Sequence, residues 1–113
     1  VAASLAIKNK CEYLWYAAHS GDHEIYPDCR PEFIQKLGDV LSICDYHEIK
    51  FEAPFMNLSK QQIVAEGLKM NLDYGNAWTC YVGGEKPCMK CSACLERMSA
   101  FKANNAIDPL NEI

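Results

Sequence analysis

The chain has 113 residues, half of them hydrophobic, and a formal net charge of −4. This length suits one small domain and is too short for two independent hydrophobic cores, and the hydrophobic share excludes a disordered tail. No basic patch indicates nucleic-acid binding, and no apolar run approaches the ~18 residues of a membrane span. We therefore expect neither nucleic acid nor a membrane as a partner.

The first half of the chain alternates helical and strand patterns. Residues 1–10 place apolar side chains at helical spacing, and the apolar run 12–18 predicts a buried parallel strand. A polar loop follows, and then Pro31 can open a helix over 32–44. The alternation in 48–52 predicts a second short strand. The apolar face of the helix comprises Phe33, Ile34, Leu37, Val40 and Leu41.

Two further helices are expected in the second half. Asn57 or Ser59 can cap a helix that extends to residue 71, with Ile63, Val64, Leu68 and Met70 facing inward. A last helix over 92–105 carries Leu95, Met98 and Phe101 at helical spacing. This order of elements predicts an α/β fold that forms the end of an open parallel sheet. We expect an α/β half-domain over 1–75, followed by a cysteine-rich segment and helix over 76–113.

Four of the seven cysteines form the most informative motif. The stretch CYVGGEKPCMKCSAC has the spacing C-x7-C-x2-C-x2-C, formed by Cys80, Cys88, Cys91 and Cys94. Thiolates at this spacing can surround one Zn²⁺ in a tetrahedron, and Gly83 and Gly84 permit the bend that the loop needs. A disulfide pair with two free thiols, or an iron–sulfur cluster, are the alternatives.

The predicted zinc site is structural rather than catalytic. Four cysteines fill the coordination shell, whereas a catalytic zinc keeps a position open for water. The histidines, His19, His23 and His47, all lie in the first half of the chain. The odd number of cysteines favours a reducing cytoplasm, and Cys11 and Cys44 are expected to be small buried side chains.

The loop after the first strand is the other candidate site, because ligands of open α/β sheets bind at the carboxyl ends of strands. Arg30 can hold a carboxylate or phosphate through paired hydrogen bonds, Asp28 can accept from a guanine-like edge, and Tyr26 offers a stacking face. The alternatives are structural: Asp28 can set the turn, and Arg30 can pair with Asp28 or Glu32.

Two more residues of this loop have alternative interpretations. Cys29 can be a nucleophile near a helix N-terminus, although no base is evident and a structural thiol is favoured. His19 follows the strand end, where ligands bind, but an ordinary surface histidine explains it equally well. The sequence therefore leaves the catalytic residues unknown.

Three stretches, YPDCRPEF, APFMNLSKQQIV and WTCYVGGEKPCMKCSAC, together resemble the C-terminal half of the 7-cyano-7-deazaguanine synthase family. This family belongs to the PP-loop ATP pyrophosphatases of adenine nucleotide α-hydrolase-like fold. The resemblance covers residues 1–110 and implies conversion of 7-carboxy-7-deazaguanine, ammonia and ATP to the nitrile in queuosine biosynthesis. The carboxylate is activated by ATP and amidated, and the amide is then activated again and dehydrated.

The resemblance assigns the four zinc ligands to Cys80, Cys88, Cys91 and Cys94 and places the YPDCR segment, with Tyr26, Asp28 and Arg30, near the deazaguanine. The glycine-rich SGGxDS loop that binds ATP in this superfamily does not occur in the sequence. We therefore expect the chain to be part of a longer or split protein and to be inactive without its N-terminal half. Its expected protein partner is that half or, in a homo-oligomer, a second copy. A non-catalytic zinc-knuckle module, or a relative that modifies another acceptor, are the alternative functions.

Overall fold

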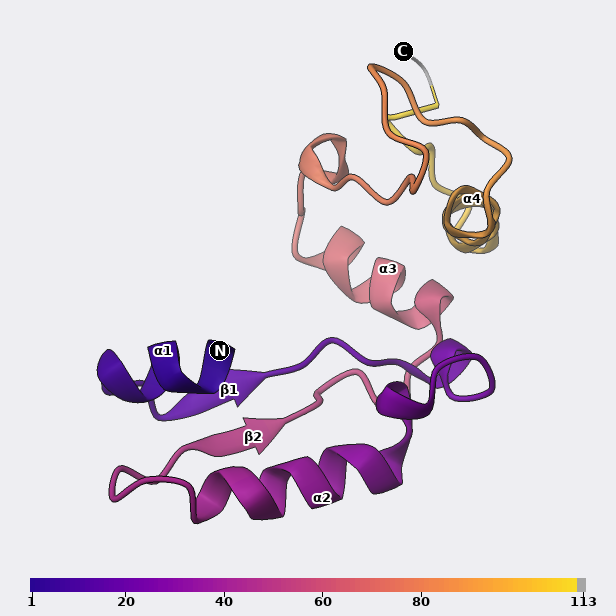
Figure 1. Cartoon of the computed structure of the whole chain (residues 1–113). Helices are drawn as coiled ribbons and strands as arrows, with labels where there is room; N and C mark the ends of the chain where they lie inside the picture. The colour runs from indigo at the N-terminus through magenta and orange to yellow at the C-terminus, as the bar shows by residue number, and fades with distance from the viewer. Residues whose placement is uncertain (112–113) are drawn as a thin grey trace. The chain divides into compact units, whose positions relative to one another are not determined.

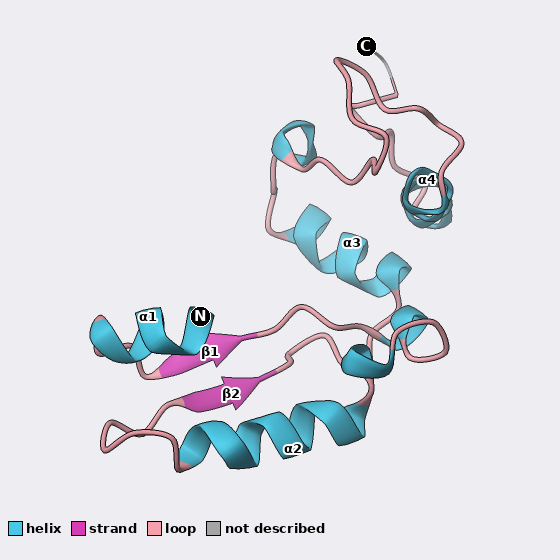
Figure 2. Cartoon of the chain, viewed as in Figure 1, coloured by secondary structure: helices cyan, strands magenta, loops and turns pink. Residues whose placement is uncertain are grey.

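The computed structural model describes residues 1–111, which form two compact units, although the length of the chain had predicted one small domain. The first unit contains residues 1–58 and the second begins at Ser59. Figure 1 follows the chain through both, and Figure 2 distinguishes helices, strands and loops. Within the described range, no helix has the length and apolar character needed to cross a membrane.

A pair of parallel strands forms the centre of the first unit. Strand β1 (Tyr13–Trp15) pairs with β2 (Lys50–Glu52), and Leu14 lies opposite Phe51. The backbone N–H of Tyr16 extends the ladder by donating to the carbonyl of Glu52 at 2.8 Å. Parallel pairing was predicted from the sequence and is confirmed over these residues, although the strand in 12–18 is shorter than its apolar run.

Two helices accompany this strand pair. Helix α1 (Ala2–Lys8) precedes β1, and α2 (Pro31–Ser42) packs against β2. Pro31 occupies the first turn of α2, where its missing N–H costs no hydrogen bond. Both helices were predicted, as was the role of Pro31, and the structure confirms them.

Side-chain burial in the first unit differs from the expectation at several positions. Trp15 is 68% exposed and Val40 57% exposed, although both were expected to be buried. Cys11 and Cys44 are also exposed rather than buried. The short strand pair covers little surface, and the fully buried large side chain in this unit is Ile49.

The second unit is helical. Helix α3 (Lys60–Lys69) has Ser59 as its N-cap, and the Ser59 hydroxyl accepts from the N–H of Gln62 at 3.3 Å. The Gln62 side chain accepts from the N–H of Ser59 at 2.8 Å, which completes a capping box. Ser59 was one of the two caps predicted, and it is confirmed.

The core of the second unit forms where α3 packs against α4 (Ser92–Ala103). This packing places the unit boundary after Leu58, before the division at residue 75 expected from the sequence. Met70 was expected to face inward but is 69% exposed, because α3 ends at Lys69. The core comprises Val64, Ala100 and Phe101, with Leu68, Tyr74 and Ala106 packed against them.

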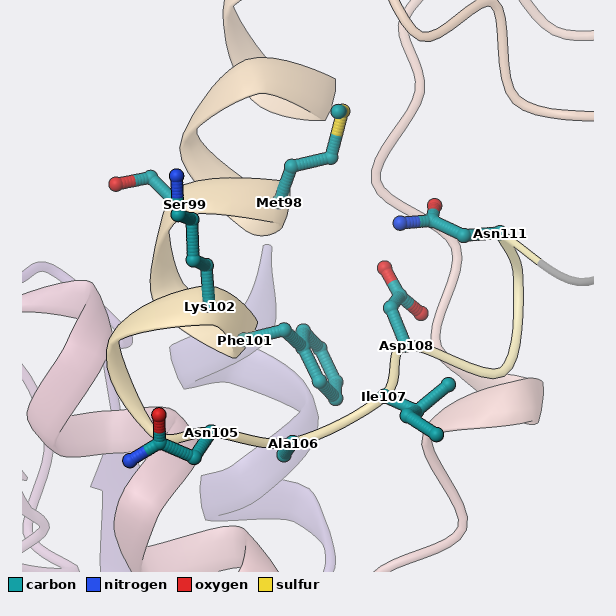
Figure 3. Close-up of a pocket in the computed structure, with 9 residues that line it drawn as sticks. All are labelled: Met98, Ser99, Phe101, Lys102, Asn105, Ala106, Ile107, Asp108 and Asn111. Carbon is teal, nitrogen blue, oxygen red and sulfur yellow. The ribbon is translucent and has the colours of Figure 1, made fainter.

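A pocket lies between the second half of α4 and the chain that follows it (Figure 3). The buried Asp108 carboxylate and the ring of Phe101 both contribute to its wall. The pocket contains none of the four clustered cysteines and none of the residues predicted to bind substrate. We assign it no function.

Candidate metal centre and substrate loop

The four clustered cysteines come together at the start of α4. Their Sγ atoms all lie within 4.8 Å of one another, and those of Cys88 and Cys94 are 4.0 Å apart. Thiolates around one tetrahedral zinc lie about 3.8 Å apart when each bond is about 2.3 Å long. The cluster therefore has the donor set and nearly the spacing of a single-metal site, as the sequence predicted.

The backbone shapes this cluster in two places. Gly83 and Gly84 adopt positive φ angles of 77° and 99°, which confirms the predicted bend. Met89 also has a positive φ, of 57°, inside the first C-x2-C step. Cys91 is the N-cap of α4 and Cys94 lies in its first turn, so one helix start positions two of the four sulfurs.

Backbone N–H groups donate hydrogen bonds to the sulfurs, and such bonds stabilise the negative charge of a thiolate. The N–H of Cys88 donates to Sγ of Cys80 at 3.3 Å, and the N–H of Cys91 donates to Sγ of Cys88 at 3.3 Å. A backbone hydrogen bond from Cys88 lowers the pKa of Cys80, and one from Tyr81 lowers the pKa of Cys91 to about 6.

The Cys94 thiol differs from those of Cys80 and Cys91, because its burial raises its pKa to about 12. Its side chain is only 3% exposed, so a thiolate there needs a positive partner in place of water. A divalent metal ion supplies that charge, and thus the donor set fits Zn²⁺.

The two alternative interpretations of the cluster fit the geometry less well. All seven cysteines are free thiols, so no disulfide occupies the cluster. A four-iron cluster separates its thiolates more widely than one ion does, because the iron–sulfur core lies between them. The close approach of the sulfurs favours a single ion.

The predicted substrate loop lies between β1 and α2 and contains two short 3₁₀ turns, η1 (Ser20–Asp22) and η2 (Pro27–Cys29). Both strand arrows in Figure 1 point toward this purple loop, so it lies at the carboxyl end of the strand pair. Tyr26 is 45% exposed, and Asp28 and Arg30 are also exposed.

Arg30 is anchored at one edge of its guanidinium. Its Nε donates to the carbonyl of His23 at 2.8 Å. Within the described part of the chain it forms no ion pair with Asp28 or with Glu32, which pairs with Lys36 instead. Arg30 is exposed, and its two terminal nitrogens make no hydrogen bond to the described residues, so together they can hold a carboxylate end-on.

The remaining candidates of this loop have structural partners. His19 is only 5% exposed, so the expectation of an ordinary surface histidine is wrong. The Cys29 thiol lies 3.9 Å from the hydroxyl of Tyr16 and 4.0 Å from a carboxylate oxygen of Asp28. Burial, followed by the contact with Cys29, raises the pKa of Tyr16, so this phenol stays protonated and cannot serve Cys29 as a base near neutral pH.

These features define an α/β protein with a parallel strand pair and a four-cysteine centre that can hold a metal ion. The model of the family described as queuosine biosynthesis protein QueC matches residues 1–105, and the chain belongs to this family. The resemblance seen in the sequence is thereby confirmed.

Curated relatives match almost the whole chain. The chain is 50% identical over 110 residues to 7-cyano-7-deazaguanine synthase 1 of Colwellia psychrerythraea and, at the same identity, to the 7-cyano-7-deazaguanine synthases of Marinobacter nauticus and Pseudoalteromonas translucida. Each match covers 97% of this chain and 50% of the relative. The chain thus spans about half the length of these relatives and corresponds to their C-terminal half.

Proposed function

We propose that this chain is the zinc-bearing half of an enzyme that converts 7-carboxy-7-deazaguanine, ammonia and ATP to 7-cyano-7-deazaguanine. The observation that carries the proposal is the 50% identity, over 97% of the chain, to proteins named for this product. The strand pair is then the end of an open parallel sheet of the adenine nucleotide α-hydrolase-like type. Residues outside this sequence supply the PP-loop that holds the pyrophosphate of ATP.

In this proposal the four cysteines bind one structural zinc and take no part in the reaction. The ion fixes the loop 80–91 to the start of α4 and stabilises the fold. Four thiolates leave no coordination position open for water, and the sequence has no His beside the cluster of the kind that catalytic zinc sites often use as a ligand. Binding of the acid substrate is assigned to the exposed loop at the strand ends.

The substrate loop supplies recognition. The terminal nitrogens of Arg30 bind the substrate carboxylate, Asp28 accepts from the guanine-like edge, and Tyr26 stacks on the ring. ATP transfers AMP to the carboxylate with release of pyrophosphate, and ammonia then displaces AMP to form the amide. A second ATP transfers AMP to the amide oxygen, again with release of pyrophosphate, and that oxygen leaves with AMP as the nitrogen loses its protons to give the nitrile. Arg30 thus orients the carboxylate for the first activation.

The proposal also requires a second segment of protein against the first unit. Exposed apolar side chains on α1 and β1 support this: Leu5 is 56%, Tyr13 43% and Trp15 68% exposed. Such side chains favour burial against a partner surface. We propose that the N-terminal half of the protein buries these side chains. A second copy of the chain in a homo-oligomer is the alternative.

The test is ATP-dependent nitrile formation by the full-length protein, followed by mass spectrometry. Arg30→Ala is expected to raise the KM for 7-carboxy-7-deazaguanine by about tenfold to hundredfold, as loss of a charged hydrogen-bond partner does, and to leave zinc content unchanged. Lys36→Ala removes the same charge from the exposed face of α2 and serves as the control. Unchanged kinetics for Arg30→Ala would remove Arg30 from the substrate site, and absence of nitrile with the unaltered protein would refute the function.

A further inference from the structure

His19 occupies a buried position directly before η1, and both nitrogens of its ring are in use. Nδ1 accepts from the N–H of Gly21 at 3.1 Å, and Nε2 lies 3.1 Å from a carboxylate oxygen of Asp22. Because Nδ1 is an acceptor, the ring proton is on Nε2 and is donated to Asp22. The ring therefore has no free nitrogen with which to bind substrate or move a proton.

These contacts fix the backbone of η1. His19 is its N-cap, and Ser20 ties the same turn to the segment after β2 by donating to the carbonyl of Leu58 from both N–H and hydroxyl, at 3.0 and 2.9 Å. The carbonyl of Asp22 in turn accepts from the N–H of Ile25 and from that of Tyr26. The position of the His23 carbonyl, directly after η1, follows from this arrangement.

That carbonyl is the group that holds Nε of Arg30. We infer that His19 is a positioning residue for substrate binding: its ring fixes η1, η1 places the His23 carbonyl, and that carbonyl aims the terminal nitrogens of Arg30. The inference rests on the proposed function of Arg30. It extends that function by naming a buried side chain that sets the angle at which the carboxylate is held.

Variants of His19 separate its two contacts. His19→Ala removes both, whereas His19→Asn keeps a side-chain oxygen near the place of Nδ1 and can still accept from Gly21. In the full-length enzyme we expect His19→Ala to raise the KM for 7-carboxy-7-deazaguanine about tenfold or more with little change in kcat, because misplacement of a binding group by even 1 Å costs up to about a hundredfold. His19→Asn should restore most of the loss.

A double-mutant cycle tests whether the effect passes through Arg30. In an Arg30→Ala background, His19→Ala should raise the KM less than twofold further, because the group it positions is gone. Equal effects of His19→Ala in both backgrounds would overturn the inference. His19→Leu, which fills the buried site but can make neither contact, is the second variant to use if His19→Ala does not fold, and it should show the same loss of coupling.

A second measurement does not depend on activity. Hydrogen exchange of the Arg30 Nε–H, followed by NMR, should be slow in the unaltered protein and in His19→Asn, and at least tenfold faster in His19→Ala or His19→Leu. Exchange that is unchanged in both of these last variants overturns the positioning role. If exchange changes as expected but no nitrile forms with any variant, the proposed function fails while the structural link between His19 and Arg30 stands.

Discussion

Arg97 and Asp108 form a buried ion pair with two parallel hydrogen bonds. Nε of Arg97 donates to one carboxylate oxygen of Asp108 at 2.6 Å, and Nη2 donates to the other at 2.7 Å. The same guanidinium donates to the carbonyls of Tyr74 and Ala77. One side chain of α4 thus joins the chain before the cysteine cluster to the chain after the helix.

Removal of one member of this pair should be costly. Asp108→Ala leaves a buried guanidinium without its counter-charge and takes an acceptor from the N–H of Leu110, so we expect a loss of about 3–5 kcal/mol in the free energy of unfolding. Urea denaturation of the zinc-loaded protein measures this loss.

Lys69→Ala is the matched control for Asp108→Ala, because it breaks an exposed pair with Glu66 in the same unit. Its expected cost is below about 1 kcal/mol. Similar small losses for the two variants would show that burial adds nothing to the Arg97–Asp108 pair.

Gly67 is a second position where the fold constrains the sequence. A Cβ atom there would overlap the hydroxyl of Tyr74, lie 2.8 Å from its Cζ and lie 3.2 Å from Leu72. Alanine ordinarily stabilises a helix interior relative to glycine, but here we expect Gly67→Ala to destabilise the protein by about 1–3 kcal/mol through overpacking. Thermal unfolding provides the comparison.

Gly38 in α2 is the control for Gly67. The nearest atom to its added Cβ would be Cδ1 of Phe51 at 3.9 Å, an ordinary contact. Gly38→Ala should therefore stabilise the protein by about 0.4–1 kcal/mol. A gain from both alanines would mean that Tyr74 moves aside without cost.

Local signals in the sequence predicted the helices well. Pro31 and Ser59 mark helix starts through backbone chemistry that acts within one turn, and the cysteine spacing encodes a cluster within 15 residues. Burial was harder to predict. In α4 the buried side chains include Cys94, Arg97 and Phe101, whereas Leu95 is 53% exposed, because the cysteine cluster and Asp108 set the rotation of the helix.

Contacts between distant residues gave no signal in the sequence. The Arg97–Asp108 pair joins a helix to a loop, where no periodicity applies. His19 was considered as a loop residue, but its burial depends on a turn whose shape the sequence does not reveal. The hydrogen bond from Arg30 to the His23 carbonyl was missed for the same reason.

Loss of one cluster cysteine should release the metal. Cys91→Ser removes a thiolate ligand while leaving a favoured N-cap residue at the start of α4, and we expect zinc per chain to fall from about one to near zero, because structural sites depend on their full ligand set. Metal analysis and far-UV circular dichroism follow the change. Cys44→Ser, at an exposed thiol outside the cluster, should keep its zinc; a folded, zinc-loaded Cys91→Ser protein would contradict the assignment.

Chelation of zinc should act on one unit of the chain more than on the other. Helix α4 has Cys91 as its N-cap and supplies Ala100 and Phe101 to a core of only a few side chains, so loss of the metal should open this core. Helix α2 contains no cluster ligand and packs against β2. Since structural zinc contributes its binding energy to folding, hydrogen exchange after chelation should quicken at least tenfold in 92–103 and change little in 31–42. Equal acceleration in both segments would mean that the ion stabilises the whole chain as one cooperative unit, and no acceleration would mean that the cysteines hold no structural metal.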